Sequence, residues 1–245
     1  MAVSRAAESY VRALRTAVPA VVELPALDNH PDCVFVEDTA VVVGDTALIT
    51  AMGHPSREGE QAAVEGALRD LRGASGGQLR VVRADDLVPG ARVDGGDVLY
   101  TGTELFVGIS SRTTDAGVAS LRAAFPGLPV HPITVTGALH LKSLLTLCAP
   151  GAIVASSTAA GKAAAEAVVA AATSEYRVVY VPTDALANVV FANGTLIHRA
   201  ESEHPGGEAA FAQLPGVQRR VEVEAGEAEK ADGALTCCSL LVRLP

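Results

Sequence analysis

Residues 34–50, with the sequence VFVEDTAVVVGDTALIT, decide the fold because they predict a β-hairpin. Two runs rich in Val, Ile, Thr and Phe, at residues 35–43 and 46–50, are typical of strands. Gly44 and Asp45 stand between the runs, and these two residue types favour a tight turn between antiparallel strands. The hairpin begins a longer repeat.

The same order of elements recurs along the chain. A helical pattern at residues 57–72 and an apolar run at residues 79–82 follow the hairpin, which gives two strands, a helix and a third strand. Three more repeats have this order, and their predicted elements are residues 98–101, 105–109, 115–125 and 128–135, then 144–147, 152–155, 158–173 and 176–181, then 187–191, 195–198, 208–214 and 218–224. A period of about 45 to 50 residues indicates a propeller or another array of repeats.

A fifth repeat has to be assembled from the two ends of the chain. A helix at residues 4–18, a strand at residues 20–24 and a strand at residues 235–244 supply its parts, so one strand is missing on the N-terminal side. No shift in composition and no long linker divides the chain. We therefore expect an α/β fold in a single domain over residues 1–245.

The composition excludes several classes of protein. Of the 245 residues, 49% are hydrophobic, which is enough for a sizeable core. The formal net charge is -9 and no block of Lys and Arg is present, so we expect a small cationic or zwitterionic ligand and no nucleic acid. Without a leader peptide or an apolar stretch of about 18 residues, we expect no membrane partner and a cytoplasmic location. Both a monomer and a homodimer are open.

Two residues are candidates for nucleophilic chemistry, although each has a structural explanation. His140 stands between leucines in residues 137–143, GALHLKS, and a lone histidine in such a place is more often part of a core. Cys237 is followed by Cys238, and a strand would direct these two side chains to opposite faces. The cysteine spacing fits neither a secreted disulfide framework nor a metal site, so we expect thiols.

Two acidic motifs are more informative. Residues 32–38, DCVFVED, place three carboxylates around an apolar run. A guanidinium pairs with carboxylates through its planar fork of donors, so converging acids favour a ligand of that kind over a simple turn cap. Residues 93–97, VDGGD, carry two further acids around two glycines that allow a close approach of the backbone. A plain loop before a strand is an equal alternative for this second motif.

Several stretches together resemble a known family. The sequences PDCVFVEDTAVV, ALIT, GHPSR, DGGDVLYTG, ELFVGISSRT, LHLKS and DGALTCCS are similar, in the same order, to successive motifs of dimethylarginine dimethylaminohydrolases. The similarity runs from about residue 24 to the end of the chain. It implies the pentein fold, in which five ββαβ repeats surround a pseudo-fivefold axis, and this agrees with the period of the repeats.

The resemblance implies an amidine hydrolase that converts dimethylarginine, and monomethylarginine, to citrulline without a metal or organic cofactor. Cys237 would attack the guanidinium carbon, His140 would protonate the departing amine and then activate water, and Asp94 would hold the imidazole. The residues implied to bind the substrate are Asp32, Glu37 and Asp38 at the guanidinium, Arg57 and Arg112 at the carboxylate, and the backbone of Ala231 at the α-amino group.

Other functions are open at this point. An arginine deiminase or an amidinotransferase would use a similar set of residues, and a pentein without catalysis would bind a ligand only. The missing N-terminal strand is where the family has a mobile loop over its substrate. A misplaced start codon, a shortened chain or a natural short form would each explain this, and we expect a natural short form to turn over weakly because a lid excludes water.

Overall fold

The computed structural model describes residues 2–74, 76–77 and 79–243. These form two compact units, which we describe separately. The first unit comprises Met1–Val21 and Lys142–Thr236, and the second comprises Val22–Leu141 and Cys237–Pro245. The prediction of a single domain stays a prediction.

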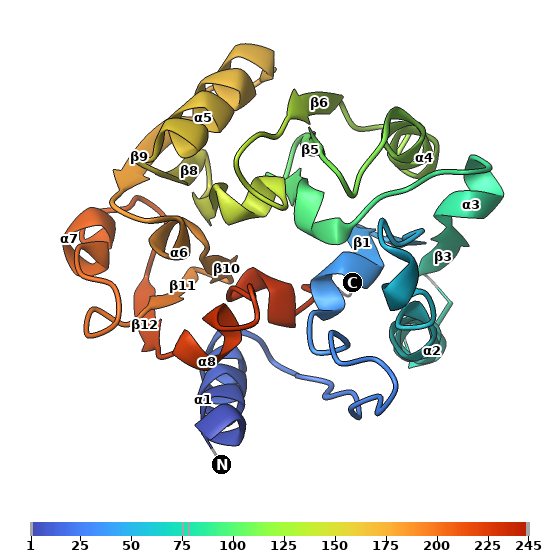
Figure 1. Ribbon diagram of the computed structural model, residues 1–245, viewed down its shortest axis with the longest axis horizontal. Helices are drawn as coiled ribbons and strands as arrows, with labels where there is room; N and C mark the ends of the chain where they lie inside the picture. Colours follow the sequence, from blue (N-terminus) through green and yellow to red (C-terminus); the bar gives the residue numbers. More distant parts are fainter. Residues whose placement is uncertain (1, 75, 78, 244–245) are drawn as a thin grey trace. The chain divides into compact units, whose positions relative to one another are not determined.

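Each unit contains two sheets of three strands, all with the same topology. In every sheet the first strand is antiparallel to the second, and the third is parallel to the second. Figure 1 labels most of these strands. The strands of the second unit are β1 (Ala40–Val43), β2 (Thr46–Ile49), β3 (Arg80–Arg83), β4 (Val98–Tyr100), β5 (Leu105–Ile109) and β6 (Val130–Thr134). Those of the first unit are β7 (Leu145–Ala149), β8 (Ala152–Ser156), β9 (Arg177–Val181), β10 (Val190–Ala192), β11 (Thr195–Arg199) and β12 (Arg219–Val223).

Helices connect the strands in both units. The α-helices are α1 (Ala2–Ala17), α2 (Gln61–Ala74), α3 (Ala84–Leu87), α4 (Asp115–Ala124), α5 (Ala159–Ala171), α6 (Asp184–Ala187), α7 (Gly207–Phe211) and α8 (Gly226–Glu229). Short 3-10 helices are η1 (Val36–Thr39), η2 (Pro55–Arg57), η3 (Gly95–Asp97), η4 (Leu141–Ser143) and η5 (Thr236–Cys238). Threonines begin several helices: the Thr158 hydroxyl, for example, accepts from the Gly161 amide at 3.1 Å and so satisfies a free donor at the start of α5.

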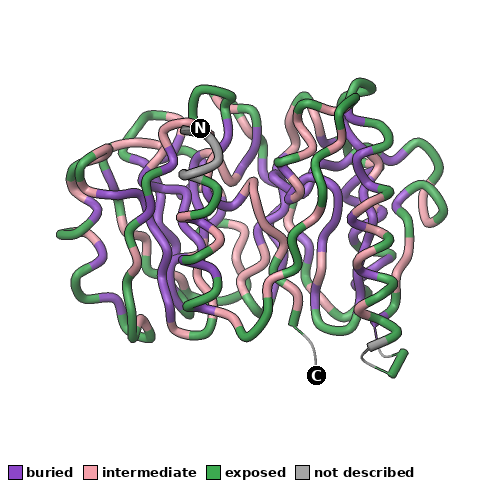
Figure 2. Tube along the Cα trace, turned by 90° about the horizontal axis from the view of Figure 1, so that it is seen from below, coloured by how far each residue is buried: buried purple, intermediate pink, exposed green. Residues whose placement is uncertain are grey.

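The core of the second unit lies between its sheets and their helices. One cluster joins β1 and β2 to β4, β5 and α4, with Leu48, Leu105 and Leu121 fully buried. The other lies under α2 and includes Ile49 and Leu68. Figure 2 shows how buried and exposed stretches alternate along the chain. Apolar burial of this kind is the main stabilising term of each unit.

A network of ion pairs around the buried Arg199 stabilises part of the first unit. The Arg199 side chain at the end of β11 is 2% exposed and pairs with Glu203 and Glu229, both at 2.9 Å. Glu203 also accepts from the backbone amides of Ala225 and Gly226, at 2.9 and 3.0 Å. One arginine thus attaches the short helix α8, which could not stand alone, to the sheet.

The four predicted repeats are confirmed, although the bounds of several elements differ: the strand predicted at residues 187–191 begins at Val190, and the helix predicted at residues 57–72 begins at Gln61. The strand predicted at residues 35–43 begins only at Ala40, because Val36–Thr39 form η1 instead. Turn formation is favoured there by the Thr39 hydroxyl, which donates to the Val36 carbonyl oxygen at 2.7 Å.

The two strands predicted for the fifth repeat are wrong within the part of the chain that the structure describes. Residues 20–24 have no regular structure, and residues 236–238 form η5 where the second strand was expected to begin. A strand needs a partner for its backbone hydrogen bonds, whereas apolar side chains can be buried without one. Leu24, Leu240 and Val242 accordingly pack against the cluster under α2 without joining a sheet.

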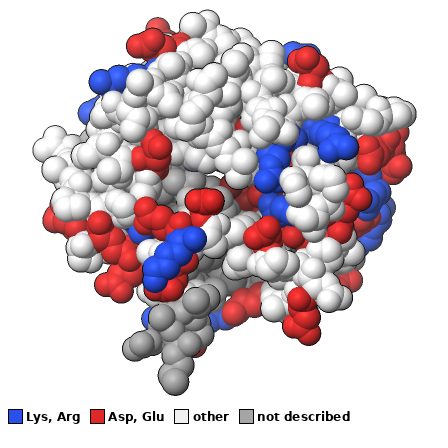
Figure 3. Space-filling view, in the orientation of Figure 1, with Lys and Arg blue, Asp and Glu red and all other residues white. Residues whose placement is uncertain are grey.

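On the face drawn in Figure 3, Lys and Arg side chains stand in small groups among Asp and Glu side chains. Among the described helices, none is both long and apolar enough to cross a membrane.

Candidate active site

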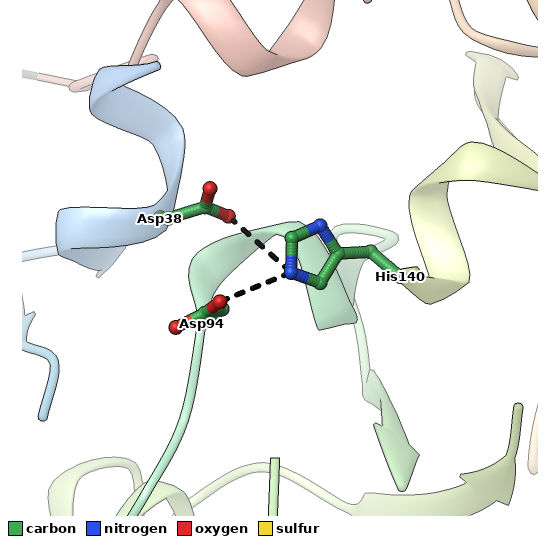
Figure 4. Close-up of side chains that lie close together, drawn as sticks. All are labelled: Asp38, Asp94 and His140. Atoms are coloured by element: carbon green, nitrogen blue, oxygen red, sulfur yellow. Dashed lines mark hydrogen bonds and ion pairs between the residues drawn. The ribbon is translucent and has the colours of Figure 1, made fainter. Parts of the chain in front are cut away.

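Three buried charged residues of the second unit form the centre of the site. The imidazole Nε2 of His140 lies 3.1 Å from Oδ2 of Asp94 and 4.0 Å from Oδ1 of Asp38 (Figure 4). Both carboxylates are fixed by backbone donors: the Gly53 amide donates to Asp94 at 2.7 Å, and the Gly96 amide donates to Asp38 at 2.9 Å. Two acids therefore face one ring nitrogen with little freedom to move.

Local folding explains how the two acids converge. The turn of η1 directs Glu37 and Asp38 into the protein, where both are buried. The element η3, directly after Asp94, packs against η1 so closely that only glycine fits. A Cβ on Gly95 would lie 2.0 Å from the Glu37 carbonyl oxygen, and one on Gly96 would lie 2.7 Å from His140 Nδ1. The two glycines of the DGGD motif thus allow the two acidic motifs to meet.

Burial and charge act in opposite directions on His140. Burial lowers its pKa, while the hydrogen bond to the Asp94 carboxylate and the charges of Asp38, Asp97 and Asp94 raise it. The carboxylates prevail, so the pKa of His140 is raised above its ordinary value. The site therefore favours an imidazolium, which is a proton donor.

Arg57 is buried and already engaged by acids. Its Nη1 lies 2.5 Å from Oδ2 of Asp38, and its Nε and Nη2 donate to Glu60 at 2.9 and 2.7 Å. Nη2 also donates to the carbonyl oxygens of Phe35 and Asp32, at 3.0 and 3.3 Å. A substrate carboxylate could reach this guanidinium only by displacing Asp38 or Glu60.

Arg112 is the more accessible of the two predicted arginines. Its side chain is 21% exposed, and Nη1 lies 3.8 Å from Oδ2 of Asp94. Its backbone lies tightly against Gly53, because a Cβ on that glycine would come within 2.3 Å of the Arg112 carbonyl oxygen. A cation that borders the cluster while still facing solvent is suited to an anionic group of a ligand.

The adjacent thiols lie in η5 and are both half-buried, and neither is in a disulfide. Burial and the charge of Glu37 raise the pKa of Cys238 to about 12, which keeps that thiol protonated and unreactive. Cys237 belongs to the same compact unit as His140. Of the two, Cys237 is the better candidate for a nucleophile.

The remaining predicted residues differ in their position. Asp32 is half-buried and belongs to the second unit with the other acids. Ala231 is exposed and belongs to the first unit, where its amide donates to the Ala228 carbonyl oxygen at 3.0 Å. The structure thus places all the predicted residues except Ala231 in one unit.

The donor atoms of Asp38, Asp94 and His140 lie within 4.8 Å of one another, a spacing that would also suit a divalent cation. A protonated imidazole supplies positive charge at the same place.

Two buried acids received no role from the sequence. Glu60, three residues after Arg57, holds that guanidinium, and Asp97, the second acid of the DGGD motif, has no exposed surface. The motif itself was the available signal for Asp97. No comparable pattern marks Glu60.

Comparison with known proteins assigns the chain to a family. Residues 13–144 match the model of the Arginine deiminase family. The N(G),N(G)-dimethylarginine dimethylaminohydrolase of Streptomyces coelicolor is 36% identical over 96% of this chain and 84% of its own length. The human protein DDAH2 is 34% identical over 91% of this chain and 77% of its own length.

A solved structure supports the fold. The dimethylarginine dimethylaminohydrolase of Pseudomonas aeruginosa, a cysteine-to-serine mutant complexed with citrulline, matches with a TM-score of 0.80 and 26% identity over 96% of this chain and 86% of that chain. This chain therefore belongs to the dimethylarginine dimethylaminohydrolase family and has its pentein fold.

Proposed function

We propose that the protein hydrolyses Nω,Nω-dimethyl-L-arginine, and the monomethyl form, to citrulline and the corresponding amine. The observation that carries this proposal is the buried His140 with Asp94 at 3.1 Å and Asp38 at 4.0 Å, in the same unit as Cys237. A guanidinium is a poor electrophile, so its hydrolysis needs a strong nucleophile and a proton donor for the leaving amine. A thiolate and an imidazolium meet both needs.

Substrate binding would use charges of both signs. Asp38 would orient the guanidinium through Oδ1, because Oδ2 already pairs with Arg57, and Asp32 and Glu37 would add negative charge around it. Arg112 would bind the substrate carboxylate, and the Ala231 backbone would contact the α-amino group. Arg57 could bind the substrate carboxylate together with Arg112 only by breaking its pair with Asp38. Its main role would therefore be to hold Asp38 in place.

The reaction would proceed through a covalent intermediate. The Cys237 thiolate adds to the guanidinium carbon and forms a C–S bond, which gives a tetrahedral adduct. His140 transfers its proton to the dimethylamino nitrogen, and the C–N bond breaks. Dimethylamine departs, and an S-alkylthiouronium remains on Cys237. The neutral imidazole then takes a proton from water, and the hydroxide adds to the same carbon to form a second tetrahedral adduct. Its collapse breaks the C–S bond and releases the thiolate, and loss of the hydroxyl proton to solvent or to the departed amine gives citrulline.

The decisive test measures citrulline and dimethylamine produced by the wild type, Cys237→Ala and His140→Ala. We expect both variants to lose turnover, whereas His204→Ala, a histidine variant in the first unit, should keep it. Trapping of the Cys237 adduct by mass spectrometry would support the covalent step. Citrulline binding together with a Cys237 that does not react with a haloacetamidine would instead indicate a binding protein without catalysis.

An arginine deiminase is the second candidate, and the match of residues 13–144 to that family favours it. The two activities differ in the leaving group. Ammonia released from arginine faster than dimethylamine from dimethylarginine would identify the deiminase. The cytoplasmic location and the monomeric or homodimeric state expected from the sequence stay predictions.

A further inference from the structure

Asp97 is a buried carboxylate that the proposed reaction does not use. It has no exposed surface, and the Ser110 hydroxyl donates to Oδ2 at 2.6 Å while the Leu141 amide donates to Oδ1 at 2.9 Å. The space around it depends on Gly108 in β5, where a Cβ would lie 2.4 Å from Oδ1. A carboxylate without water is costly unless bonds of this kind satisfy it, so its presence calls for a specific role.

Asp97 binds the backbone directly next to His140. The Leu141 amide belongs to the peptide that directly follows His140, so the hydrogen bond to Asp97 fixes the chain at the base of the imidazole. The two groups also interact by charge. Burial raises the pKa of Asp97, and the charge of His140 and hydrogen bonds from Ser110, Thr113 and Leu141 oppose that rise. The carboxylate and the imidazolium thus stabilise each other.

The same carboxylate reaches Arg112 and Asp94 through two hydroxyl groups. The Ser110 oxygen that donates to Asp97 accepts from the amides of Arg112 and Thr113, at 3.0 and 3.2 Å. The Thr113 hydroxyl oxygen in turn accepts from the Asp94 amide at 3.2 Å. Three segments that are distant in sequence therefore meet at one buried side chain.

We propose that Asp97 is a positioning residue that fixes His140, Asp94 and Arg112 relative to one another and places a negative charge beside the imidazole. This inference rests on the proposed function, because the arrangement matters for turnover only if His140 is the proton donor. Its effect on the imidazole itself is independent of turnover.

The charges around His140 determine what a neutral replacement would do. Asp38 faces the ring from η1, Asp94 and Asp97 flank it at either end of η3, and Arg112 lies beside Asp94 on the loop after β5. Replacing Asp97 by Asn removes one negative charge and keeps the shape of the side chain. The pKa of His140 should therefore fall, and the imidazolium should be lost at a lower pH than in the wild type.

The experiment compares Asp97→Asn with Glu104→Gln. Glu104 is a suitable control because it is also fully buried and also pairs with a histidine, His131 at 2.9 Å, but it is not among the groups that shift His140. The ring resonance of His140 is titrated by NMR in each protein. We expect Asp97→Asn to move the His140 titration to lower pH and Glu104→Gln to leave it in place. An unchanged titration in a folded Asp97→Asn protein would overturn the proposal.

A second variant tests the link to Arg112 and does not depend on Asp97→Asn folding. Ser110→Ala removes the bridging hydroxyl while the carboxylate stays. We expect a fall in kcat/KM of about tenfold, mostly in KM, with an unchanged His140 titration, because Arg112 loses its anchor. An unchanged KM in an active Ser110→Ala enzyme would contradict the proposal. If the wild type itself were inactive, the proposed function would fail while the NMR titrations would still decide the role of Asp97.

Discussion

At the scale of single residues, the two adjacent thiols should differ in reactivity. Cys238 has a pKa raised to about 12 by burial and by Glu37, whereas Cys237 is the proposed nucleophile. We expect Cys237→Ser to lose at least about 1000-fold in kcat and Cys238→Ser to keep most activity, measured as citrulline formation. Alkylation by iodoacetamide near neutral pH, located by mass spectrometry, should mark Cys237 first. Preferential alkylation of Cys238 would reverse the assignment.

The raised pKa of His140 sets a pH dependence. An imidazole whose pKa is higher in the folded than in the unfolded protein contributes stability that is fully present below the unfolded value, about 6.5, and is lost as pH rises through the folded value. The proton donor is lost over the same range, so kcat should fall there. Both effects are checked by measuring kcat and the free energy of unfolding from ~pH 6 to ~pH 9, with His140→Gln as the control for stability. A stability that increases with pH across this range, relative to the control, would contradict it.

At the scale of elements, the contact of η1 with η3 depends on Gly96, which has no side chain. A Cβ at position 96 would lie 2.7 Å from His140 Nδ1 and 2.8 Å from Asp38 Oδ1, so Gly96→Ala must displace one of them. We expect kcat/KM to fall about 100-fold, because small displacements at a reacting centre are costly. Gly66→Ala in α2 is the control: nothing lies within 4 Å, and the change should stabilise the protein by about 0.5–1 kcal/mol without altering kcat. Equal activities of the two variants would show that η3 can shift to accommodate the added methyl group without disturbing the site.

The attachment of α8 to β11 can be tested in the same way, by removing one side chain. Arg199→Ala leaves Glu203 and Glu229 without their buried partner, but both carboxylates still reach solvent, so we expect a loss of about 1.5–3 kcal/mol in a denaturant titration. Lys230→Ala breaks the exposed pair with Glu227 and should cost no more than about 1 kcal/mol. A small effect of Arg199→Ala would mean that α8 is held by its other contacts.

The elements also show what sequence could and could not predict. The four hairpins followed from local patterns, such as the Gly44 turn, because a hairpin needs only its own residues. The strands expected at residues 20–24 and 235–244 depended on partners elsewhere, and the apolar side chains there are buried without pairing. The site follows the same division. Its acids were evident from two motifs, whereas the pairing of Arg57 with Asp38 and Glu60 arises only from their meeting in space.

At the scale of the whole molecule, the two compact units should respond differently to a ligand. Citrulline at about 100 times its Kd would stabilise the state that binds it by about 2.7 kcal/mol. We expect hydrogen exchange to slow most in η1, in η3 and at residues 110–113 of the second unit, and least in β11 of the first. Cys237→Ser, which should bind citrulline without reacting, serves for this measurement. Greater protection of β11 would place the ligand elsewhere.

The division of the chain also bears on its synthesis. The second unit is built from Val22–Leu141 and the late segment Cys237–Pro245, so the acids and the imidazole leave the ribosome long before the sulfur that they are proposed to serve. Contacts between residues so distant in sequence form late, since a long loop must close first. A stalled or unfinished chain would therefore carry the proton donor without a nucleophile. Reaction with an electrophile at this place therefore has to wait until Cys237 has been made and the segment that carries it has joined the rest of its unit.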